Sequence, residues 1–262
     1  MTETIKFGLI GHPIEHSLSP ALFKAGYGGR YEYELIIEEH FEQAFEKFIK
    51  GDYKGINVTA PFKESALQKA DILSEECQKI GATNLLMKTP EGIKAFNSDY
   101  LGVRIWISMV ADGLKSFSGY KIPRVLIVGT GGAGKAAAEA ARSHEYDVIL
   151  MNRTQYTDEI RPLSEFREAF KAADIIIYNL PVRLAELDLL GKEDFIEGKP
   201  KHILEANYRN PSFDEELIQK FKEIHSQMEY TSGETWLLLQ ALTGYEIFTG
   251  EKPNLEKMTA VL

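Results

Sequence analysis

The pattern of hydrophobic and polar positions changes its spacing repeatedly along the chain. In the N-terminal part, short apolar or β-branched runs predict strands at residues 6–11, 31–36 and 55–61. Between the second and third run, apolar side chains recur at the spacing of one helix face: Phe41, Ala44, Phe45, Phe48 and Ile49. This spacing predicts an amphipathic helix that packs on a sheet.

The same alternation of strands and helices restarts at Arg124. Further strands are expected at residues 124–129, 147–152, 174–179 and 202–207. Helices are expected from Ala133, near residues 163–173 and around residues 236–249. Alternation of this kind implies right-handed crossovers and mostly parallel sheets, so we expect an α/β fold.

Glycine and proline positions divide this pattern into two halves. Residues 112–123 contain Gly113, Gly119 and Pro123 among polar residues, which predicts a loop leading into a second sheet. The last predicted helix is free to cross back onto the first half. We therefore expect two α/β domains, formed by residues 1–101 with 238–262 and by residues 102–237.

Charge and composition narrow the possible partners and location. The chain has 262 residues, and 44% hydrophobic with 26% charged residues is the balance of a globular protein. A formal net charge of −9 excludes the basic stripe that a nucleic-acid partner would require. The N-terminus shows no basic leader, and no segment reaches the ~18 apolar residues of a membrane span. We expect a cytoplasmic protein with no nucleic-acid or membrane partner.

Metal-binding patterns are also missing from the sequence. Cys77 is the only cysteine, which excludes an intramolecular disulfide and a cysteine-based zinc site. No H-E-x-x-H or EF-hand pattern occurs, and the six histidines form no close pair on one predicted helix face. We therefore expect no metal site.

The stretch VLIVGTGGAGKAAA allows two readings as a phosphate-binding loop. Gly129, Gly131 and Gly134 make the G-x-G-x-x-G turn that places a dinucleotide pyrophosphate on a helix N-terminus. Residues 129–135 also match most of a nucleoside-triphosphate loop, G-x-x-x-x-G-K. That loop needs Ser or Thr after its lysine to bind magnesium, and here the residue is Ala136. The sequence therefore favours a dinucleotide.

The end of the next predicted strand indicates which dinucleotide. An NAD enzyme carries Asp or Glu there, where the side chain bonds the ribose 2′-hydroxyl. This chain carries Asn152, Arg153 and Thr154 instead. A guanidinium can pair with a 2′-phosphate that a carboxylate would repel, so the cofactor is predicted to be NADP.

Polar residues follow several predicted strands in the first half. Ser17 and Ser19 precede a helix that Pro20 could start, and they read either as a helix cap or as a polyol-binding pair. The other polar candidates follow short apolar stretches: Asn57, Thr59, Lys63, Asn84 and Asp99. Ligands of open α/β sheets bind at such strand ends. Taken singly, each of these residues could equally be a turn or surface residue.

Taken together, these segments resemble the shikimate dehydrogenase family in order through nearly the whole chain. The matching motifs are G-x-P-I/L-x-H-S-x-S-P at residues 11–20, N-V-T-x-P-F/Y-K at 57–63, I-G-A-x-N at 80–84, N-T/S-D-x-x-G at 97–102, G-x-G-G-A at 129–133, N-R-T at 152–154, and G-x-x-M-L-x-x-Q-A at 233–241 with one departure. Seven motifs in one order are far more specific than any one of them.

The resemblance implies an N-terminal α/β substrate domain, a Rossmann-type doubly wound nucleotide-binding domain and a cleft between them. It implies that Ser17 and Ser19 contact the shikimate carboxylate. Further implied substrate contacts are Asn57, Thr59, Asn84, Asp99, Tyr208 and Gln240. Implied cofactor-binding residues are Gly129, Gly131, Gly132, Ala133, Asn152, Arg153, Thr154 and Gly233. The expected assembly is a monomer or a homodimer.

The resemblance also implies the reaction, the NADPH-dependent reduction of 3-dehydroshikimate to shikimate in the biosynthesis of chorismate and aromatic amino acids. Lys63 and Asp99 would be the catalytic pair. Lys63 would stabilise and protonate the developing alkoxide, and Asp99 would orient the lysine and hold the reacting hydroxyl.

Departures from the family pattern leave alternatives open. Trp236 stands where the family usually has Met, and no second basic residue closely follows Arg153. Leu180 departs from the common N-A-T-P segment, so a hydroxyl group near the cofactor is missing. A quinate/shikimate dehydrogenase able to use NAD is one alternative. A non-catalytic ligand-sensing relative is another, although Lys63 and Asp99 are both present and no DNA-binding domain is apparent.

Overall fold

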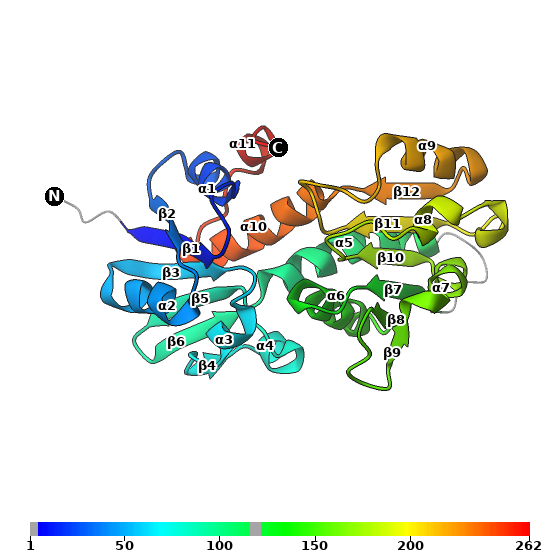
Figure 1. The fold of residues 1–262 in the computed structure, drawn as a ribbon. Helices are drawn as coiled ribbons and strands as arrows, with labels where there is room; N and C mark the ends of the chain where they lie inside the picture. The colour runs from blue at the N-terminus through cyan, green and yellow to red at the C-terminus, as the bar shows by residue number, and fades with distance from the viewer. Residues whose placement is uncertain (1–4, 116–121) are drawn as a thin grey trace. The chain divides into compact units, whose positions relative to one another are not determined.

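The computed structural model describes residues 5–115 and 122–262, and the chain divides into two compact units. The first unit comprises Met1–Gly102 and Leu238–Leu262, and the second comprises Val103–Leu237. The chain passes between the units inside two helices, α5 (Ser98–Lys115) and α10 (Gly233–Thr249) (Figure 1). Each unit contains one six-stranded sheet, which confirms the predicted α/β class.

The loop predicted over residues 112–123 is wrong for its first part, because α5 continues to Lys115. Val103, Ile107, Ala111 and Leu114 are all buried, so one apolar helix face extends past the point where glycine suggested a stop. Residues 116–121 of the predicted loop, which include Gly119, lie outside the described residues.

The sheet of the first unit has the order β2-β1-β3-β5-β6-β4. Its strands are β1 (Lys6–Gly11), β2 (Glu32–Ile37), β3 (Tyr53–Val58), β4 (Ile72–Leu73), β5 (Leu85–Thr89) and β6 (Gly92–Phe96). β5 runs antiparallel to both of its neighbours, and the other pairings are parallel. The start of β5 therefore lies at the same sheet edge as the ends of β1, β3 and β6.

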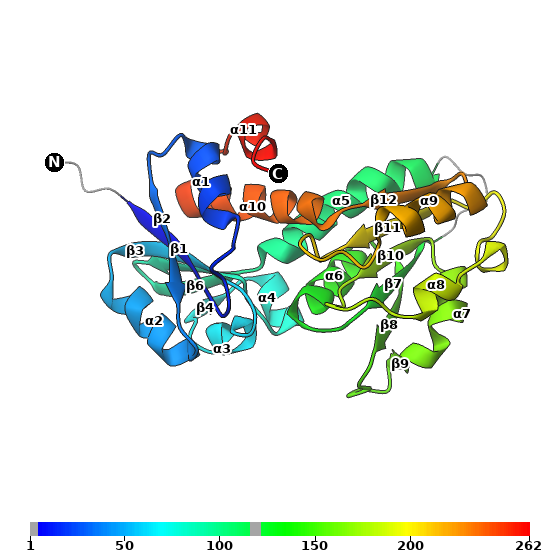
Figure 2. The same ribbon diagram turned by 45° about the horizontal axis from the view of Figure 1, so that its top comes forward.

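Helices cover both faces of this sheet: α1 (Ser19–Tyr27), α2 (Phe41–Lys50), α3 (Lys63–Leu67), α4 (Glu75–Ile80), part of α10, and α11 (Leu255–Thr259). Figures 1 and 2 show α1 and α2 on opposite faces. The predicted amphipathic helix is confirmed as α2, which buries Phe41, Ala44 and Phe48 against the sheet. Ile49, at the flank of that face, is 43% exposed.

Aromatic side chains form the core on the α1 face. The ring of Phe7 in β1 lies 5.4 Å from Phe23 of α1 and 4.9 Å, stacked, from Phe248 of α10. Tyr245 of α10 meets Phe23 edge-on at 4.7 Å. The C-terminal part of α10 is therefore an integral layer of the first unit.

The sheet of the second unit is entirely parallel, with the order β12-β11-β10-β7-β8-β9. Its strands are β7 (Arg124–Val128), β8 (Asp147–Asn152), β9 (Ile160–Pro162), β10 (Ile175–Tyr178), β11 (Lys201–Glu205) and β12 (Met228–Thr231). In chain order this is 3-2-1-4-5-6 read from β9, the doubly wound arrangement of dinucleotide-binding folds. Ligands of such sheets bind where the order reverses, here between β7 and β10.

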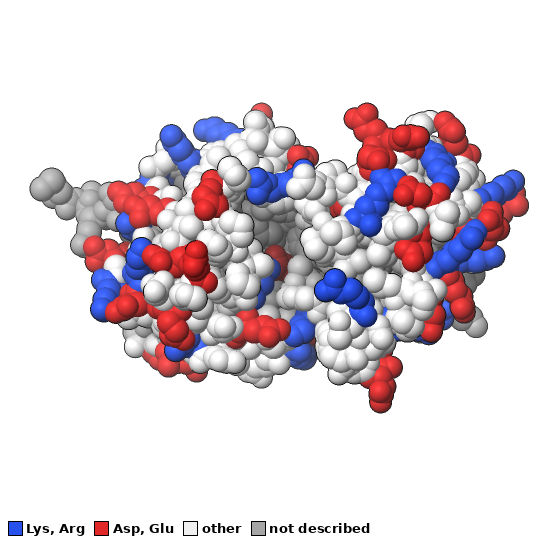
Figure 3. Space-filling view, viewed as in Figure 1, with Lys and Arg blue, Asp and Glu red and all other residues white. Residues whose placement is uncertain are grey.

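Helices α6 (Gly132–Ser143), α7 (Phe166–Ala172), α8 (Glu186–Leu189) and α9 (Glu215–Ile224) belong to this unit, with short 3₁₀ turns at Leu163–Glu165 and Lys192–Asp194. α6 buries five alanines, which lets it lie close to β7, β8 and β10. α7 and α9 contribute large aromatic residues, among them Phe170 and Phe221, to the core on the sheet. On the viewed face of each unit, acidic and basic side chains are interspersed (Figure 3).

Candidate active site

The predicted catalytic pair of the first unit forms an ion pair. Lys63 is the first residue of α3, and its Nζ lies 2.5 Å from Oδ2 of Asp99. The two side chains are 16% and 12% exposed, so the pair is largely shielded from water without being sealed off. Asp99 lies in the first turn of α5, where the helix dipole stabilises a negative charge.

The two predicted serines lie at the start of α1 and contact each other. The Ser17 hydroxyl donates to the Ser19 hydroxyl at 3.1 Å, and the Ser19 backbone N–H donates to Ser17 Oγ at 3.2 Å. The helix-cap reading is wrong, because Leu18 is the N-cap residue and no side chain caps the helix. Pro20 does lie in the first turn, as predicted. Neither serine occupies the N-cap position, although Ser17 Oγ accepts the N–H of the first helical residue.

The predicted amides are held by a hydrogen-bonded chain across the sheet edge. Asn57 Nδ2 donates to the backbone carbonyl of Asn84 at 3.3 Å. Asn84 Oδ1 accepts the backbone N–H of Ser98 at 2.7 Å, and its Nδ2 donates to the Ser98 hydroxyl at 2.9 Å. That hydroxyl lies 3.1 Å from Oε1 of Gln240. Ser98, which the sequence did not single out, thus joins two predicted substrate contacts.

Thr59 follows the end of β3, where the sequence placed it. Its backbone N–H donates to the backbone carbonyl of Ile10 in β1 at 2.9 Å, and its carbonyl accepts the N–H of Phe62 at 3.0 Å. β3 therefore ends at Val58 rather than at Pro61, because the chain turns at Thr59 toward α3. This turn brings Lys63 to the same edge as Asn57.

Tyr33 is a further polar group of this edge that the sequence did not reveal. Its hydroxyl donates to Oδ1 of Asn57 at 2.7 Å, although the two residues lie in β2 and β3 with β1 between them. Burial, with a smaller contribution from Tyr245, raises the pKa of Tyr33 well above its ordinary value. Tyr33 therefore stays protonated and acts as a donor.

In the second unit, the glycine-rich loop joins β7 to α6 as predicted. Gly129 has φ +92°, a backbone conformation that glycine adopts without strain, and a Cβ on Gly134 would lie 1.9 Å from the Gly129 carbonyl. A Cβ on Gly131 would meet no protein atom within 4 Å. Gly132 and Ala133 are the first residues of α6, so their backbone N–H groups belong to the free helix N-terminus.

Buried polar atoms without partners mark the same end of the sheet. Oγ1 of Thr130 follows β7, and Oδ1 of Asn179 follows β10; neither has a hydrogen-bond partner within the described parts of the chain. The side chain of Leu180 lies over Gly129, where a Cβ would be 3.0 Å away. These features all lie where the strand order reverses between β7 and β10: the glycine turn, the open space at Gly131 and the two unpartnered atoms. The residues present therefore fit a dinucleotide.

The predicted phosphate-reading segment follows β8. Asn152 is the last residue of that strand, and Arg153 and Thr154 are exposed after it. Gln155 Nε2 donates to the backbone carbonyls of Asn152 and Arg153 at 2.9 and 3.2 Å, which fixes the turn. The Arg153 side chain is exposed, so its guanidinium is accessible to a ligand.

A buried carboxylate fixes the loop that carries Tyr208. Glu205, at the end of β11 and 0% exposed, accepts the backbone N–H groups of Ser212 and Phe213 and the hydroxyl of Tyr230. Partial burial raises the pKa of Tyr208. A Cβ on Gly233 would lie 2.8 Å from the backbone N of Tyr208, so the start of α10 packs directly on this loop. Tyr208 belongs to the second unit, unlike the other predicted substrate contacts.

Trp236 also belongs to the second unit. Its side chain is 5% exposed, and its Nε1 has no hydrogen-bond partner among the described residues. The departure from Met that the sequence showed therefore adds a buried donor as well as bulk.

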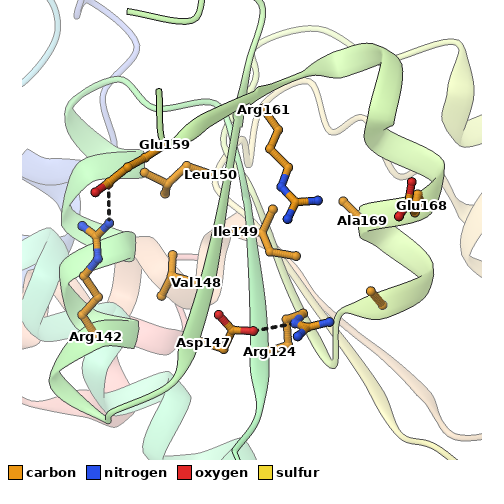
Figure 4. A pocket seen from close by; sticks show the side chains of 11 residues that line it. Arg124, Arg142, Asp147, Val148, Ile149, Leu150, Glu159, Arg161, Glu168 and Ala169 are labelled. Carbon is orange, nitrogen blue, oxygen red and sulfur yellow. Dashed lines mark hydrogen bonds and ion pairs between the residues drawn. The ribbon is translucent and has the colours of Figure 1, made fainter. Parts of the chain in front are cut away.

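Other parts of the second unit are less suited to a ligand. A hollow of about 490 Å³ lies beside β8 and α7 (Figure 4). Its arginines are paired: Arg124 Nε lies 2.7 Å from Asp147, and Arg142 lies 3.3 Å from Glu159.

Within residues 5–115 and 122–262, no group of His, Cys, Asp or Glu side chains is arranged to hold a metal ion. No helix of the described chain has the length and apolar character to cross a membrane.

Both units match models of known domain families. Residues 9–86 match the shikimate dehydrogenase substrate binding domain. Residues 108–225 match the NAD binding domain of D-isomer specific 2-hydroxyacid dehydrogenases. The two matches fall within the first and the second unit, respectively.

Full-length relatives cover both units together. A shikimate dehydrogenase (NADP(+)) of Caldanaerobacter subterraneus is 30% identical over 94% of this chain and 91% of that protein. Another, of Ignicoccus hospitalis, is 31% identical over 94% of each. The crystal structure of shikimate 5-dehydrogenase from Thermus thermophilus in complex with NADP(H) and shikimate superposes with a TM-score of 0.75, at 27% identity over 98% of each chain. With this coverage and the seven motifs in order, the chain belongs to the shikimate dehydrogenase family.

Proposed function

We propose that this protein is an NADP-dependent shikimate dehydrogenase, which catalyses the reversible reduction of 3-dehydroshikimate to shikimate. The observation that carries the proposal is the shielded Lys63–Asp99 ion pair, which lies at the strand edge that also presents hydroxyl and amide groups. Relatives named as shikimate dehydrogenases (NADP(+)) match 94% of the chain.

The first unit is the proposed substrate-binding part. A small, highly hydroxylated acid loses many hydrogen bonds to water when it binds, and these must be replaced group by group. Ser17 and Ser19 supply two hydroxyls for its carboxylate. Asn57, Thr59, Asn84 and Gln240 supply amides and a hydroxyl for the ring, and Tyr208 of the second unit is a further proposed contact.

The second unit is the proposed NADP-binding part. The pyrophosphate would be held at the loop formed by Gly129, Gly131, Gly132 and Ala133, where backbone N–H groups of the α6 N-terminus face outward. Arg153, between Asn152 and Thr154, would pair with the 2′-phosphate. Gly233, packed on the Tyr208 loop, would let α10 approach closely. When bound, the cofactor supplies the hydride that the reaction exchanges.

Lys63 and Asp99 carry the proton chemistry in this mechanism. In the reductive direction, the Lys63 ammonium stabilises the negative charge that develops on the carbonyl oxygen and delivers a proton to it. Asp99 keeps the ammonium in place through the 2.5 Å contact and holds the reacting hydroxyl. In the oxidative direction, Lys63 takes the same proton back.

One alternative has a specific observation in its favour. Leu180 covers Gly129 with an apolar side chain, and a single arginine follows β8. Both features would weaken discrimination between NADP and NAD, so a quinate/shikimate dehydrogenase that also uses NAD is the second candidate.

The test is the initial rate of nicotinamide absorbance change with shikimate and with quinate, each against NADP and NAD. Turnover mainly with shikimate and NADP is expected. Comparable turnover with quinate and NAD would support the second candidate. No turnover in any combination, with NADP binding intact, would contradict both and favour a ligand-sensing relative.

A further inference from the structure

Tyr33 reaches the substrate-binding edge from a strand that carries none of the residues assigned to the reaction. It lies in β2, paired with Phe7 of β1, and its ring packs 4.7 Å from Phe23 and 5.9 Å from Tyr245. These aromatic contacts fix the ring. Its hydroxyl extends over β1 to Oδ1 of Asn57, 2.7 Å away.

This contact decides how the Asn57 amide is oriented. The carboxamide oxygen accepts the Tyr33 hydrogen, so Nδ2 faces the backbone carbonyl of Asn84 at 3.3 Å. The reverse orientation would place two oxygen acceptors against each other at Asn84. Asn57 is therefore held as a donor, and its second amide hydrogen remains for a hydroxyl oxygen of the substrate.

The other neighbours of the Tyr33 hydroxyl belong to the serine side of the edge. Tyr245 Oη donates to the backbone carbonyl of Ser19 at 3.0 Å, and both Tyr245 and Ser19 interact with the Tyr33 phenol. The phenol thus lies between Ser19, a proposed carboxylate contact, and Asn57, a proposed hydroxyl contact. Tyr33 itself is only partly buried, so part of its side chain remains accessible at this edge.

We propose that Tyr33 is a specificity-determining residue of the substrate site, an inference that rests on the proposed function. The phenol fixes Asn57 as a donor and fills the space beside Ser19. A ring acid with a planar carboxyl-bearing carbon, such as shikimate or 3-dehydroshikimate, is accommodated. A ring acid with an added hydroxyl on that carbon, such as quinate, meets the phenol and is disfavoured.

The experiment compares Tyr33→Phe and Tyr33→Ala with the control Tyr31→Phe. Tyr31 precedes the same strand, and its exposed hydroxyl bonds to Glu251 at 3.3 Å, away from Asn57. For Tyr33→Phe, the KM for shikimate should rise about tenfold, because the variant loses the one hydrogen bond that orients Asn57. The value of kcat should change less than about twofold. For Tyr33→Ala, the ratio of kcat/KM for quinate to that for shikimate should rise about tenfold or more.

Thermal unfolding and NADP binding, followed by fluorescence, are measured on each variant. A merely structural role would lower the unfolding temperature of Tyr33→Phe and change kcat and KM together, which would overturn the inference. An unchanged KM in a stable Tyr33→Phe would overturn it as well. An inactive wild-type protein would overturn the proposed function and this inference with it, whereas an active wild type with an unaltered Tyr33→Phe would overturn this inference alone.

Discussion

The Nζ atom of Lys63 lies 2.5 Å from the carboxylate of Asp99, and the two residues lie in the first turns of different helices, α3 and α5. Helix starts are well suited to hold such a pair, because the local backbone is fixed by the first turn while the side chains still face outward. The pair is thus positioned by the fold before any substrate arrives, which is the condition for electrostatic stabilisation without reorganisation.

Replacing Lys63 should separate chemistry from cofactor binding. In Lys63→Ala, kcat for shikimate oxidation should fall by about 10²- to 10⁴-fold, because the proton acceptor is lost. The Kd for NADP should be unchanged, since the lysine belongs to the first unit. Lys69→Ala, which removes another ion-paired lysine of that unit, serves as control. Turnover of Lys63→Ala at the wild-type level would end its catalytic role.

Reversing the charge at Arg153 should change the cofactor preference. Arg153→Asp should raise the Kd for NADP about tenfold or more and leave NAD binding unaffected or improved, because a carboxylate repels the 2′-phosphate. Isothermal titration with both cofactors measures this directly. Arg161→Asp, another exposed arginine of the same unit, should leave the preference unaltered. Equal NADP affinity in Arg153→Asp would mean that another group reads the phosphate.

Two alanine substitutions in the glycine-rich loop should behave differently. Gly134→Ala places a methyl group 1.9 Å from the Gly129 carbonyl and should destabilise the protein by about 2 kcal/mol or more. Gly131→Ala meets no protein atom and should unfold at the wild-type temperature. It should still weaken NADP binding about tenfold, because the pyrophosphate needs close approach of the backbone. Full NADP affinity in Gly131→Ala would place the cofactor elsewhere.

A buried lysine should give the second unit a pH-dependent stability. Burial lowers the pKa of Lys201 from 10.5 to about 7. Its Nζ donates to the carbonyls of Phe170 and Ala173, both at 2.6 Å, which the two hydrogens of a neutral amine can satisfy. Between about pH 7 and 10.5 the unfolded chain binds more protons at this residue than the folded chain, so stability rises with pH in that window.

Lys201→Met tests this dependence by difference. The free energy of unfolding of the wild type minus that of the variant should increase from pH 7 to pH 9 by an amount on the order of a few kcal/mol. Chemical denaturation at several pH values measures it, and Lys222→Met, at an exposed position of the same unit, is the control. A difference that stays constant with pH would show that Lys201 is charged in the folded protein.

Features that depend on neighbouring residues in the chain were predictable. Gly129, Gly131 and Gly134 encode one local turn, and the buried stripe of α2 repeats within ten residues. Strands β1 and β8 have the predicted bounds, because each is a compact apolar run with polar or glycine ends. The triphosphate loop was excluded by one neighbouring residue, because Ala136 stands where that loop needs Ser or Thr.

Features that depend on pairing between strands were not predictable. Tyr33 meets Asn57 only because β1 lies between β2 and β3 in the sheet, and nothing in the local sequence reports that order. Ser98 likewise joins Asn84 to Gln240, which lies 142 positions after Ser98 in the sequence. The end of α5 was misjudged because Gly113 was read as a stop, whereas the burial of Leu114 continues the helix face.

The return of the chain into the first unit has a consequence for how the protein is made. Gln240, the Tyr245 contact to Ser19 and the stacking of Phe248 on Phe7 all come from α10, the penultimate helix. During synthesis, the first unit emerges from the ribosome without its closing layer, and the whole second unit is translated before that layer follows. We expect the N-terminal sheet to stay incompletely packed until α10 has been synthesised, so that substrate-binding competence follows the synthesis of the second unit rather than preceding it.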